Sequence, residues 1–409
     1  MSIQPRIRVA IFFICLAALS GAETNAADGP KPLLKTGQKV DWWFAFKFNA
    51  TSFPNCAPGA VRACIFGGTQ QNFEHFSQQF VFASSAGHSL QMGNTCIGDT
   101  KRDPLGATFN QVYRGSANYV IWNDQFYQDP DLPPCNHQDS CRKPWGHAKG
   151  MLGWSDAGDG FVLQVTTPDW PGSGSRLFPR QTGNTLGCTK DNNVKFSQHF
   201  FALKLTKEDV VKVLKALKNA SVVTSHSAGS NRQIIKNGGP SDIRQLVEEL
   251  GVLSFGRTPT KDTLSSGVQL ISKPSALHVP PWQMVSAMLG GVALNVATWR
   301  ERDEIPDTDG QTPITCWDPA LGHAGPVTNM VAGHWEGTPF GLKGGSNHAK
   351  IGVFASGDHV IFGDMNQEGF LTPDPVRGCG DRQNARGGLF FVLQDAALAS
   401  DLKKLMSPP

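Results

Sequence analysis

The chain has 409 residues, of which 40% are hydrophobic and 17% are charged, and its formal net charge is +3 at pH 7. This balance is typical of a globular protein with a large core. It excludes a polycation that would hold nucleic acid through bulk charge, so any recognition of a polyanion must come from local positive groups. Length alone favours two or three domains, and the 44 Gly and 27 Pro predict many turns and loops.

The first residues have the pattern of a secretory signal. Arg6 and Arg8 precede the apolar run Val9–Leu19, and small residues follow at Ser20–Ala22. The run is too short to span a bilayer. We therefore expect residues 1–22 to be a signal peptide and the mature protein to be secreted or periplasmic, with a net charge lowered from +3 to +1 by the loss of two arginines and no acid. No later segment has about 18 consecutive apolar residues, so no membrane association is expected.

Cysteine usage also indicates an exported protein. Beyond Cys15, which lies in the signal, eight cysteines remain: Cys56, Cys64, Cys96, Cys135, Cys141, Cys188, Cys316 and Cys379. An even number in an exported chain favours disulfides. The pairs Cys56–Cys64 and Cys135–Cys141 are close enough in sequence to close small loops, and the pairing of the other four stays open. A zinc site built from Cys135, Cys141 and either His137 or His147 is the alternative, but it lacks a CxxC clamp.

The remaining pattern predicts a mixed α/β (α+β) protein. Apolar runs bounded by turn residues predict strands at 40–48, 117–124, 148–154, 160–167, 349–355, 359–365 and 387–394. Helices are expected at 205–220 with Thr206 as N-cap, at 242–250 with Ser241 as N-cap, within 283–299, and at 395–405. The Ser-rich residues 221–230 are the expected linker between an N-terminal lobe at 36–220 and a C-terminal lobe at 231–409.

The tripeptide "HAK" occurs twice, at 147–149 and at 348–350, which are 201 residues apart. Each copy is followed by a short apolar strand, a turn containing Ser, Gly and Asp, and a second apolar strand. The second strand ends in polar residues in both copies, namely Thr166 and Asp169 in the first, and Asp364 and Asn366 in the second. The repetition predicts two lobes related by duplication.

The HxK pattern indicates chemistry on an anion. On a strand, residues i and i+2 share a face and lie about 6–7 Å apart, so His147 would project beside Lys149, and His348 beside Lys350. A lysine repels a divalent metal and attracts a phosphate. The imidazole can act as nucleophile or proton donor while the ammonium group stabilises the non-bridging oxygens. A single copy is better explained by an exposed strand edge with a solvated lysine, but two copies in matching hairpins favour one shared cleft. There, one histidine would form a phosphohistidine and the other would protonate the leaving oxygen.

The HxK pairs resemble those of the phospholipase D superfamily, although the superfamily's Asp spacing after each HxK is not reproduced. The closer resemblance is to the deoxyribonuclease II family. Five stretches carry it, in order along the chain: Val40–Phe48, Asn123–Gln125, Gly146–Pro171, His348–Asn366 and Ala385–Gly388. The segment "TGNTLGC" at Thr182–Cys188 is similar to the one that follows the first HxK block in that family.

This resemblance implies a fold of two phospholipase D-like lobes, each a β-sheet flanked by helices, arranged as a pseudo-dimer in one chain. It implies an endonuclease that cleaves double-stranded DNA best in acid, needs no metal or cofactor, and leaves 3′-phosphate and 5′-hydroxyl ends. By motif, the catalytic groups are His147, Lys149, His348 and Lys350, with Asp364 and Asn366 hydrogen-bonding the second histidine or the phosphate. Thr166 and Asp169 are the first-lobe counterparts, in a segment where the family's His-Ser is Val165–Thr166.

Further substrate contacts are expected at Arg386, Asn123 and Asp124. Arg386, with the amides of Gly387 and Gly388, either touches phosphate or forms a glycine-permitted turn. Asn123 and Asp124 either order the first histidine or close a turn.

Two other functions stay open from the sequence alone. One is a phospholipase D-like phosphodiesterase acting on a lipid or small ester, and the other is a protein that binds nucleic acid without cleaving it. Binding alone needs cations but not paired imidazoles, so the two HxK copies favour an enzyme.

Overall fold

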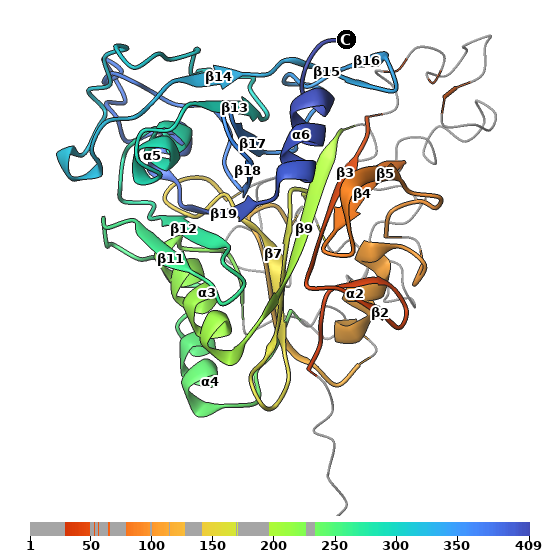
Figure 1. The fold of residues 1–409 in the computed structure, drawn as a ribbon. Helices are drawn as coiled ribbons and strands as arrows, with labels where there is room; N and C mark the ends of the chain where they lie inside the picture. Colours follow the sequence, from red (N-terminus) through yellow and green to blue (C-terminus); the bar gives the residue numbers. More distant parts are fainter. Residues whose placement is uncertain are drawn as a thin grey trace, which may run out of the picture.

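The structure is a computed structural model that describes residues 29–49, 53, 56, 64–65, 79–98, 100–113, 115–126, 141–168, 170, 196–225 and 234–409. Two large sheets pack together, with helices at their outer sides (Figure 1). The expected mixed α/β class is confirmed.

The first sheet has eight strands, and every neighbouring pair in it is antiparallel. Their spatial order is β10 (Ile235–Lys236), β6 (Asn118–Asn123), β7 (Lys149–Trp154), β8 (Gly160–Val165), β9 (Gln198–Leu205), β3 (Trp42–Lys47), β4 (Phe80–Ser84) and β5 (Gly87–Met92). The continuous apolar runs of β3, β6, β7 and β8 are buried along their whole length, as expected for strands covered on both faces. A separate small hairpin joins β1 (Leu33–Lys35) to β2 (Gln38–Lys39).

The second sheet has seven strands, antiparallel except for one parallel pair, β13 with β14. Their order is β11 (Thr260–Thr263), β12 (Gln269–Lys273), β19 (Gly388–Gln394), β18 (His359–Gly363), β17 (Ile351–Phe354), β13 (Leu294–Ala297) and β14 (Val327–Asn329). A further hairpin comprises β15 (Ala332–Trp335) and β16 (Thr338–Gly341).

Both sheets contain the same series of five antiparallel strands. The order β6-β7-β8-β9-β3 in the first sheet corresponds to β13-β17-β18-β19-β12 in the second. The helices follow the same plan. In chain order, α2 (Pro104–Tyr113) lies between β3 and the other four strands of its series, and α5 (Pro281–Met288) lies likewise between β12 and the other four, while α3 (Lys207–Asn219) and α6 (Ala396–Leu405) follow the last strand. The matching order supports the predicted duplication, and the pseudo-dimer stays a prediction.

The helices are mostly as the capping signals predict. Thr206 caps α3 and forms a capping box with Asp209. The expectation that Ser241 caps the next helix is wrong: α4 (Ser241–Glu248) begins at Ser241, and its N-cap is Pro240, whose side chain has no oxygen to accept a hydrogen bond. The helix expected within 283–299 is α5, which begins at Pro281 because proline fits the first turn. Two short 3-10 helices occupy Pro319–Leu321 and Arg382–Ala385.

The two sheets share one core. Phe44 of β3 stacks on Phe362 of β18 with ring centroids 4.8 Å apart, and Phe201 of β9 stacks on the same ring at 4.5 Å. The helices cross between the halves, since α3 follows β9 but contacts β12, and α6 follows β19 but contacts β5 (Figure 1). Residues 221–225 of the expected linker are mainly buried, and residues 226–230 lie outside the described part, so the lobe boundaries stay a prediction.

The disulfides are described in part. Cys56–Cys64 is confirmed, and Cys316–Cys379 forms a second disulfide, which the sequence leaves open. Cys96 and Cys141 are also disulfide-bonded. The predicted partner of Cys141, Cys135, lies outside the described residues, as does the expected signal peptide. Among the described helices none has the length and apolar character that a membrane span requires.

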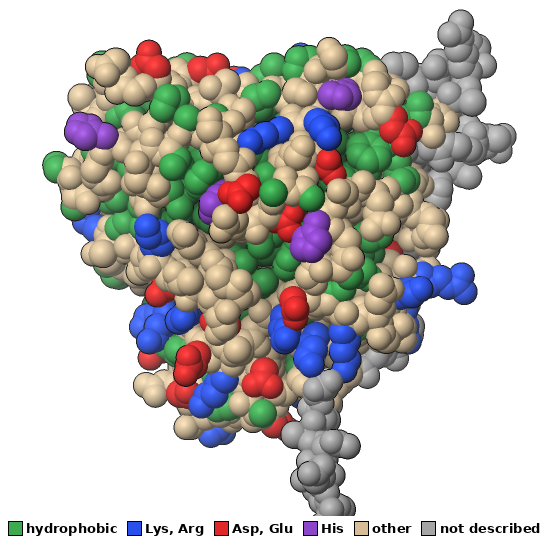
Figure 2. Space-filling model, viewed as in Figure 1, with side chains coloured by type: hydrophobic (Ala, Val, Ile, Leu, Met, Phe, Trp, Pro, Cys, Tyr) green, Lys and Arg blue, Asp and Glu red, His purple; other side chains and the backbone are tan. Residues whose placement is uncertain are grey.

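The face of the molecule that Figure 2 shows carries no large field of one sign. On the face seen in Figure 2, Lys and Arg side chains are mixed with Asp and Glu, and both are densest in its lower half. This mixture agrees with a net charge of only +3.

Candidate active site

The two HxK segments lie at the junction of the sheets, but not within strands as expected. β7 begins only at Lys149, and β17 begins at Ile351, so His147 and all of the second segment precede their strands. The reason is that their backbone pairs with the opposite half. The His147 N–H donates to the Gly387 carbonyl and the His348 N–H donates to the Ser197 carbonyl, both at 2.8 Å.

These crossed bonds fall on two equivalent segments, which we call the straps: residues 196–197, just before β9, and residues 386–387, just before β19. Each strap is held by a buried lysine at the end of the neighbouring strand. Lys47 Nζ donates to the Phe196 carbonyl at 2.7 Å, and Lys273 Nζ donates to the Arg386 carbonyl at 2.9 Å. Sequence reasoning missed both lysines, although each half contains an apolar strand that ends in lysine.

His147 lies in an ionic environment. Its Nε2 is 4.0 Å from Asp124 Oδ2, and Asp124 also binds Lys149 Nζ at 2.6 Å and Arg386 Nη2 at 2.8 Å. All four side chains are buried. Burial lowers the pKa of His147 well below 6.5, and the charges of Lys149 and Arg386 lower it further. Both effects favour the neutral form of the imidazole.

Arg386 joins the two halves. Besides Asp124, its guanidinium donates to the carbonyls of Trp145, Cys141 and Gly146 at 3.0, 2.6 and 2.9 Å. Its Nε and Nη2 are therefore engaged by the protein. The side chain orients Asp124 and the loop that leads into His147.

His348 lies in an apolar slot. Its ring stacks on Phe196 with centroids 4.5 Å apart and meets the edge of Trp299 at 4.4 Å. Burial lowers its pKa well below 6.5, with further lowering by the charges of Lys350, Lys149 and Lys47. Its Nδ1 is 3.4 Å from Gln198 Nε2, and Gln198 in turn accepts a 2.7 Å bond from Thr166 Oγ1. The predicted contact residue Thr166 thus acts on the second histidine through Gln198.

Asp364 and Thr166 occupy equivalent positions, each just past the second strand of its hairpin. The Thr166 N–H donates to the His199 carbonyl, and the Asp364 N–H to the Leu389 carbonyl. In return the His199 N–H donates to Thr166 Oγ1 and the Leu389 N–H to Asp364 Oδ2, both at 2.9 Å. Burial raises the pKa of Asp364 to about 7.

A buried chain of side chains links the halves. The Lys350 N–H donates to His199 Nδ1 at 3.1 Å, and His199 Nε2 is 3.5 Å from Gln164 Oε1. Gln164 Nε2 then donates to Asp364 Oδ1 at 3.1 Å. Because Nδ1 accepts a backbone N–H, the proton of the neutral His199 ring is on Nε2. Sequence reasoning missed His199 and Gln164, whose signal is their place on strands next to the predicted residues.

Three further predicted site residues, Asn123, Asn366 and Asp169, remain to be placed. Asn123 Nδ2 donates to the carbonyls of Thr167 and Trp170, so this side chain closes a turn rather than facing His147. Asn366 Nδ2 contacts Glu368 Oε2 at 3.3 Å, and its buried Oδ1 has no hydrogen-bond partner. Asp169 lies outside the described residues.

Each HxK lysine influences the histidine of the other half. The charge of Lys350 lowers the pKa of His147, and that of Lys149 lowers the pKa of His348, so both pairs face one region. Lys350 Nζ donates to the His348 carbonyl at 2.6 Å, and burial lowers its own pKa to about 7. In the described part of the chain, no three His, Cys, Asp or Glu side chains group as metal ligands would. The arrangement presents two imidazoles and two ammonium groups, which suits a phosphate.

Comparison with known proteins identifies the family of this chain. The model of one family, described as Deoxyribonuclease II, matches residues 31–408, which is nearly the whole chain. No curated protein matches the chain. The match includes both halves of the sheet junction and both HxK segments. The chain therefore belongs to the deoxyribonuclease II family and is a hydrolase that cleaves DNA.

Proposed function

We propose that this deoxyribonuclease is an exported endonuclease that works without a metal ion, through a phosphohistidine intermediate, and leaves 3′-phosphate and 5′-hydroxyl ends. The observation that supports it most is the crossed docking of the two HxK segments, in which each histidine N–H binds the strap of the opposite half at 2.8 Å. This arrangement supplies two imidazoles and two ammonium groups to one phosphodiester. The disulfides and the predicted signal peptide support export.

His147 is the proposed nucleophile because it lines a pocket beside the sheet junction. An imidazole nitrogen of His147 attacks phosphorus, and the bond from phosphorus to the 5′ oxygen breaks. The leaving oxygen takes its proton from the His348 imidazolium. Neutral His348 then accepts a proton from water. The resulting hydroxide attacks phosphorus, and the bond between phosphorus and the His147 nitrogen breaks. A 3′-phosphate is released and His147 is regenerated.

The lysines supply the positive charge that this reaction requires. Lys149 and Lys350 stabilise the non-bridging oxygens as negative charge develops on them. Asp124 keeps Lys149 protonated and, with Arg386, orients the loop of His147. Asp364, Thr166 and Gln198 position the second half of the site, and the Asn366 amide is available to the phosphate.

The same side chains account for a preference for acid. The nucleophile must be neutral, so the rate falls as the pH drops below its pKa. The general acid must be protonated, so the rate falls as the pH rises above its pKa. Both histidines have a pKa lowered well below 6.5, which moves the working range to the acid side of 6.5.

Incubation of plasmid DNA with the enzyme in EDTA across pH 4–8 tests the proposal. We expect nicking that persists in EDTA, a bell-shaped pH profile, and products that polynucleotide kinase labels at the 5′ end without prior phosphatase treatment. Loss of cleavage in EDTA with recovery on adding a divalent cation would refute the metal-independent mechanism. Products with 5′-phosphate ends would refute the proposed bond cleavage.

A further inference from the structure

We propose that the pocket beside His147 binds the backbone phosphate one nucleotide to the 5′ side of the scissile bond. The enzyme then requires two consecutive phosphates of one strand, in a fixed direction, for full activity. This inference rests on the proposed function, because it takes His147 as the nucleophile and the 5′ oxygen as the leaving group.

The pocket has a volume of about 710 Å³, within the range of sites for small ligands. Both halves form its wall: the loop at 142–147 from the first, and residues 302, 366–368 and 377–386 from the second. His147 is the only one of the four HxK side chains among its lining residues. The pocket therefore extends the active site on the side of His147 only.

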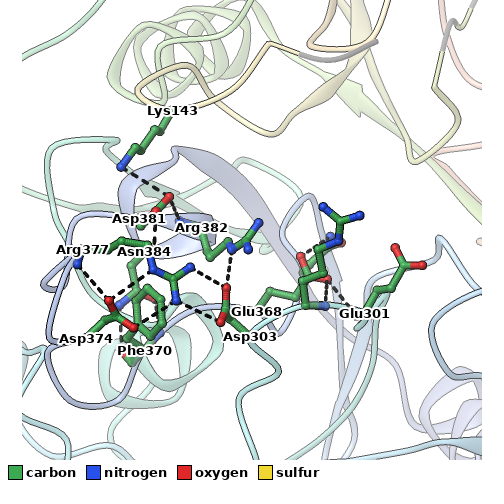
Figure 3. A network of polar contacts seen from close by, with 12 residues as sticks. Lys143, Glu301, Asp303, Glu368, Phe370, Asp374, Arg377, Asp381, Arg382 and Asn384 are labelled. Carbon is green, nitrogen blue, oxygen red and sulfur yellow. Dashed lines mark hydrogen bonds and ion pairs between the residues drawn. The ribbon is translucent and has the colours of Figure 1, made fainter. Parts of the chain in front are cut away.

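Most of the charged groups in the pocket wall are already paired (Figure 3). Arg377 binds Asp303 and Asp374, Arg382 also binds Asp303, and Lys143 Nζ lies 3.4 Å from Asp381. These ion pairs fix the shape of the loop at 374–382, which the Cys316–Cys379 disulfide also anchors.

Two arginines in the wall form no ion pair with any residue that the structure describes. The guanidinium groups of Arg142 and Arg302 have no hydrogen-bond or ion-pair partner in the part of the chain that the structure describes, and both side chains are exposed. Arginine binds phosphate bidentately and keeps its charge at every relevant pH. These two groups are available to an anion in the pocket.

Unsatisfied buried polar atoms also point to a ligand. Asn366 Oδ1 and Gln383 Oε1 have no hydrogen-bond partner among the described residues, and both residues line the pocket with at most 6% of their surface exposed. A buried polar atom without a partner carries a free-energy cost that a bound group can remove. A side-chain amide can rotate to present its NH₂ group, so Gln383 supplies a donor that a phosphate oxygen accepts.

The direction of the strand follows from the geometry of displacement. In an in-line displacement the leaving 5′ oxygen departs on the side of phosphorus opposite to the attacking nitrogen. It therefore moves away from His147. The pocket lies on the His147 side. Only the strand that stays attached to phosphorus through its 3′ oxygen can enter it, and its next phosphate is the one on the 5′ side.

Three short substrates with a single internal phosphodiester test this directly: the thymidine dinucleotide TpT, its 5′-phosphorylated form pTpT and its 3′-phosphorylated form TpTp. At pH 5 a terminal phosphate carries about one charge, like an internal diester. We expect kcat/KM in EDTA to be about tenfold or more higher for pTpT than for TpT, because one charge-assisted contact is worth at least that factor. We expect TpTp to match TpT.

The double variant Arg142→Ala/Arg302→Ala should bring the ratio of pTpT to TpT close to one. The matched control Arg244→Ala removes an exposed arginine from α4 and should keep the wild-type ratio. Equal rates for pTpT and TpT in the wild type, a preference for TpTp, or an unchanged ratio in the double variant would each overturn the inference. Failure of the proposed function looks different, since plasmid DNA would then not be cleaved in EDTA or its products would carry 5′-phosphate ends.

Discussion

Replacing Asp124 with asparagine should destabilise the protein in a way that depends on pH. The side chain is fully buried and binds two cations, Lys149 at 2.6 Å and Arg386 at 2.8 Å. Asparagine keeps the shape but loses the charge. Arg386 retains three carbonyl acceptors, whereas Lys149 loses its carboxylate partner. Removing one partner of a buried ion pair costs about 3–5 kcal/mol, and the retained shape and acceptors place this change near about 3 kcal/mol.

The pH dependence of this destabilisation shows whether the charge of Asp124 causes it. The charges of Lys149 and Arg386 lower the pKa of Asp124 below 3.8 against the opposing effect of burial. A carboxyl group with a lowered pKa contributes stability that is present above pH 3.8 and is lost as the pH falls through the folded pKa. The difference in the free energy of unfolding between wild type and Asp124→Asn should therefore be largest at pH 5–7 and become smaller below about pH 4.

Urea unfolding followed by tryptophan fluorescence, at pH 3.5, 5 and 7, measures this difference. Asp41→Asn is the matched control. Lys204 Nζ and Asp41 Oδ1 also form an ion pair, with 2.9 Å between them, but the two side chains are 46% and 66% exposed. An exposed pair contributes about 0–1 kcal/mol. A cost below about 1 kcal/mol for Asp124→Asn, or one that does not vary with pH, would refute the reasoning.

Three further predictions concern the two histidines and the lysine that acts on one of them. His147→Ala and His348→Ala should each lower DNA cleavage by about a thousandfold or more with unchanged circular dichroism, since each would remove a group that the reaction needs; substantial cleavage by both variants would contradict the paired mechanism. The profile of kcat/KM against pH should peak below 6.5, because the pKa of both histidines is lowered, and a peak at pH 7 or above would contradict this. Lys47→Met should raise the pKa of His348 in an NMR titration, because the charge of Lys47 lowers it, whereas Lys273→Met should leave it unchanged; equal shifts in both variants would argue against a direct electrostatic effect.

Local patterns were enough to predict most of the elements around the site. The strands Trp42–Lys47 and Gly388–Gln394 are apolar up to their last residue, and these apolar runs are buried as such runs usually are. Thr206 and Asp209 form a capping box that marks the start of α3. These features depend on residues within a few positions of one another, which is why the sequence alone determines them. The repeated HxK hairpins belong to the same class, because both copies can be seen without knowing where they lie in space.

The contacts that complete the site could not be predicted in this way. His147 and Gly387 are brought together by the docking of two sheets, as are Asp124 and Arg386, and nothing in either local sequence specifies its partner. The same docking takes the HxK segments out of their strands, because their backbone groups bind the straps instead of neighbouring strands.

The family, the mixed α/β class and the residue types that suit a phosphate can all be recognised from the order of amino acids alone. The difference between the two HxK copies arises only when the chain folds. The equivalent strap positions hold Phe196 beside His348 and Arg386 beside Asp124 and His147, so one histidine lies in an apolar slot and the other in an ionic cluster. The physical reason is that burial and nearby charge set the chemistry of an imidazole, and both arise from residues distant in sequence.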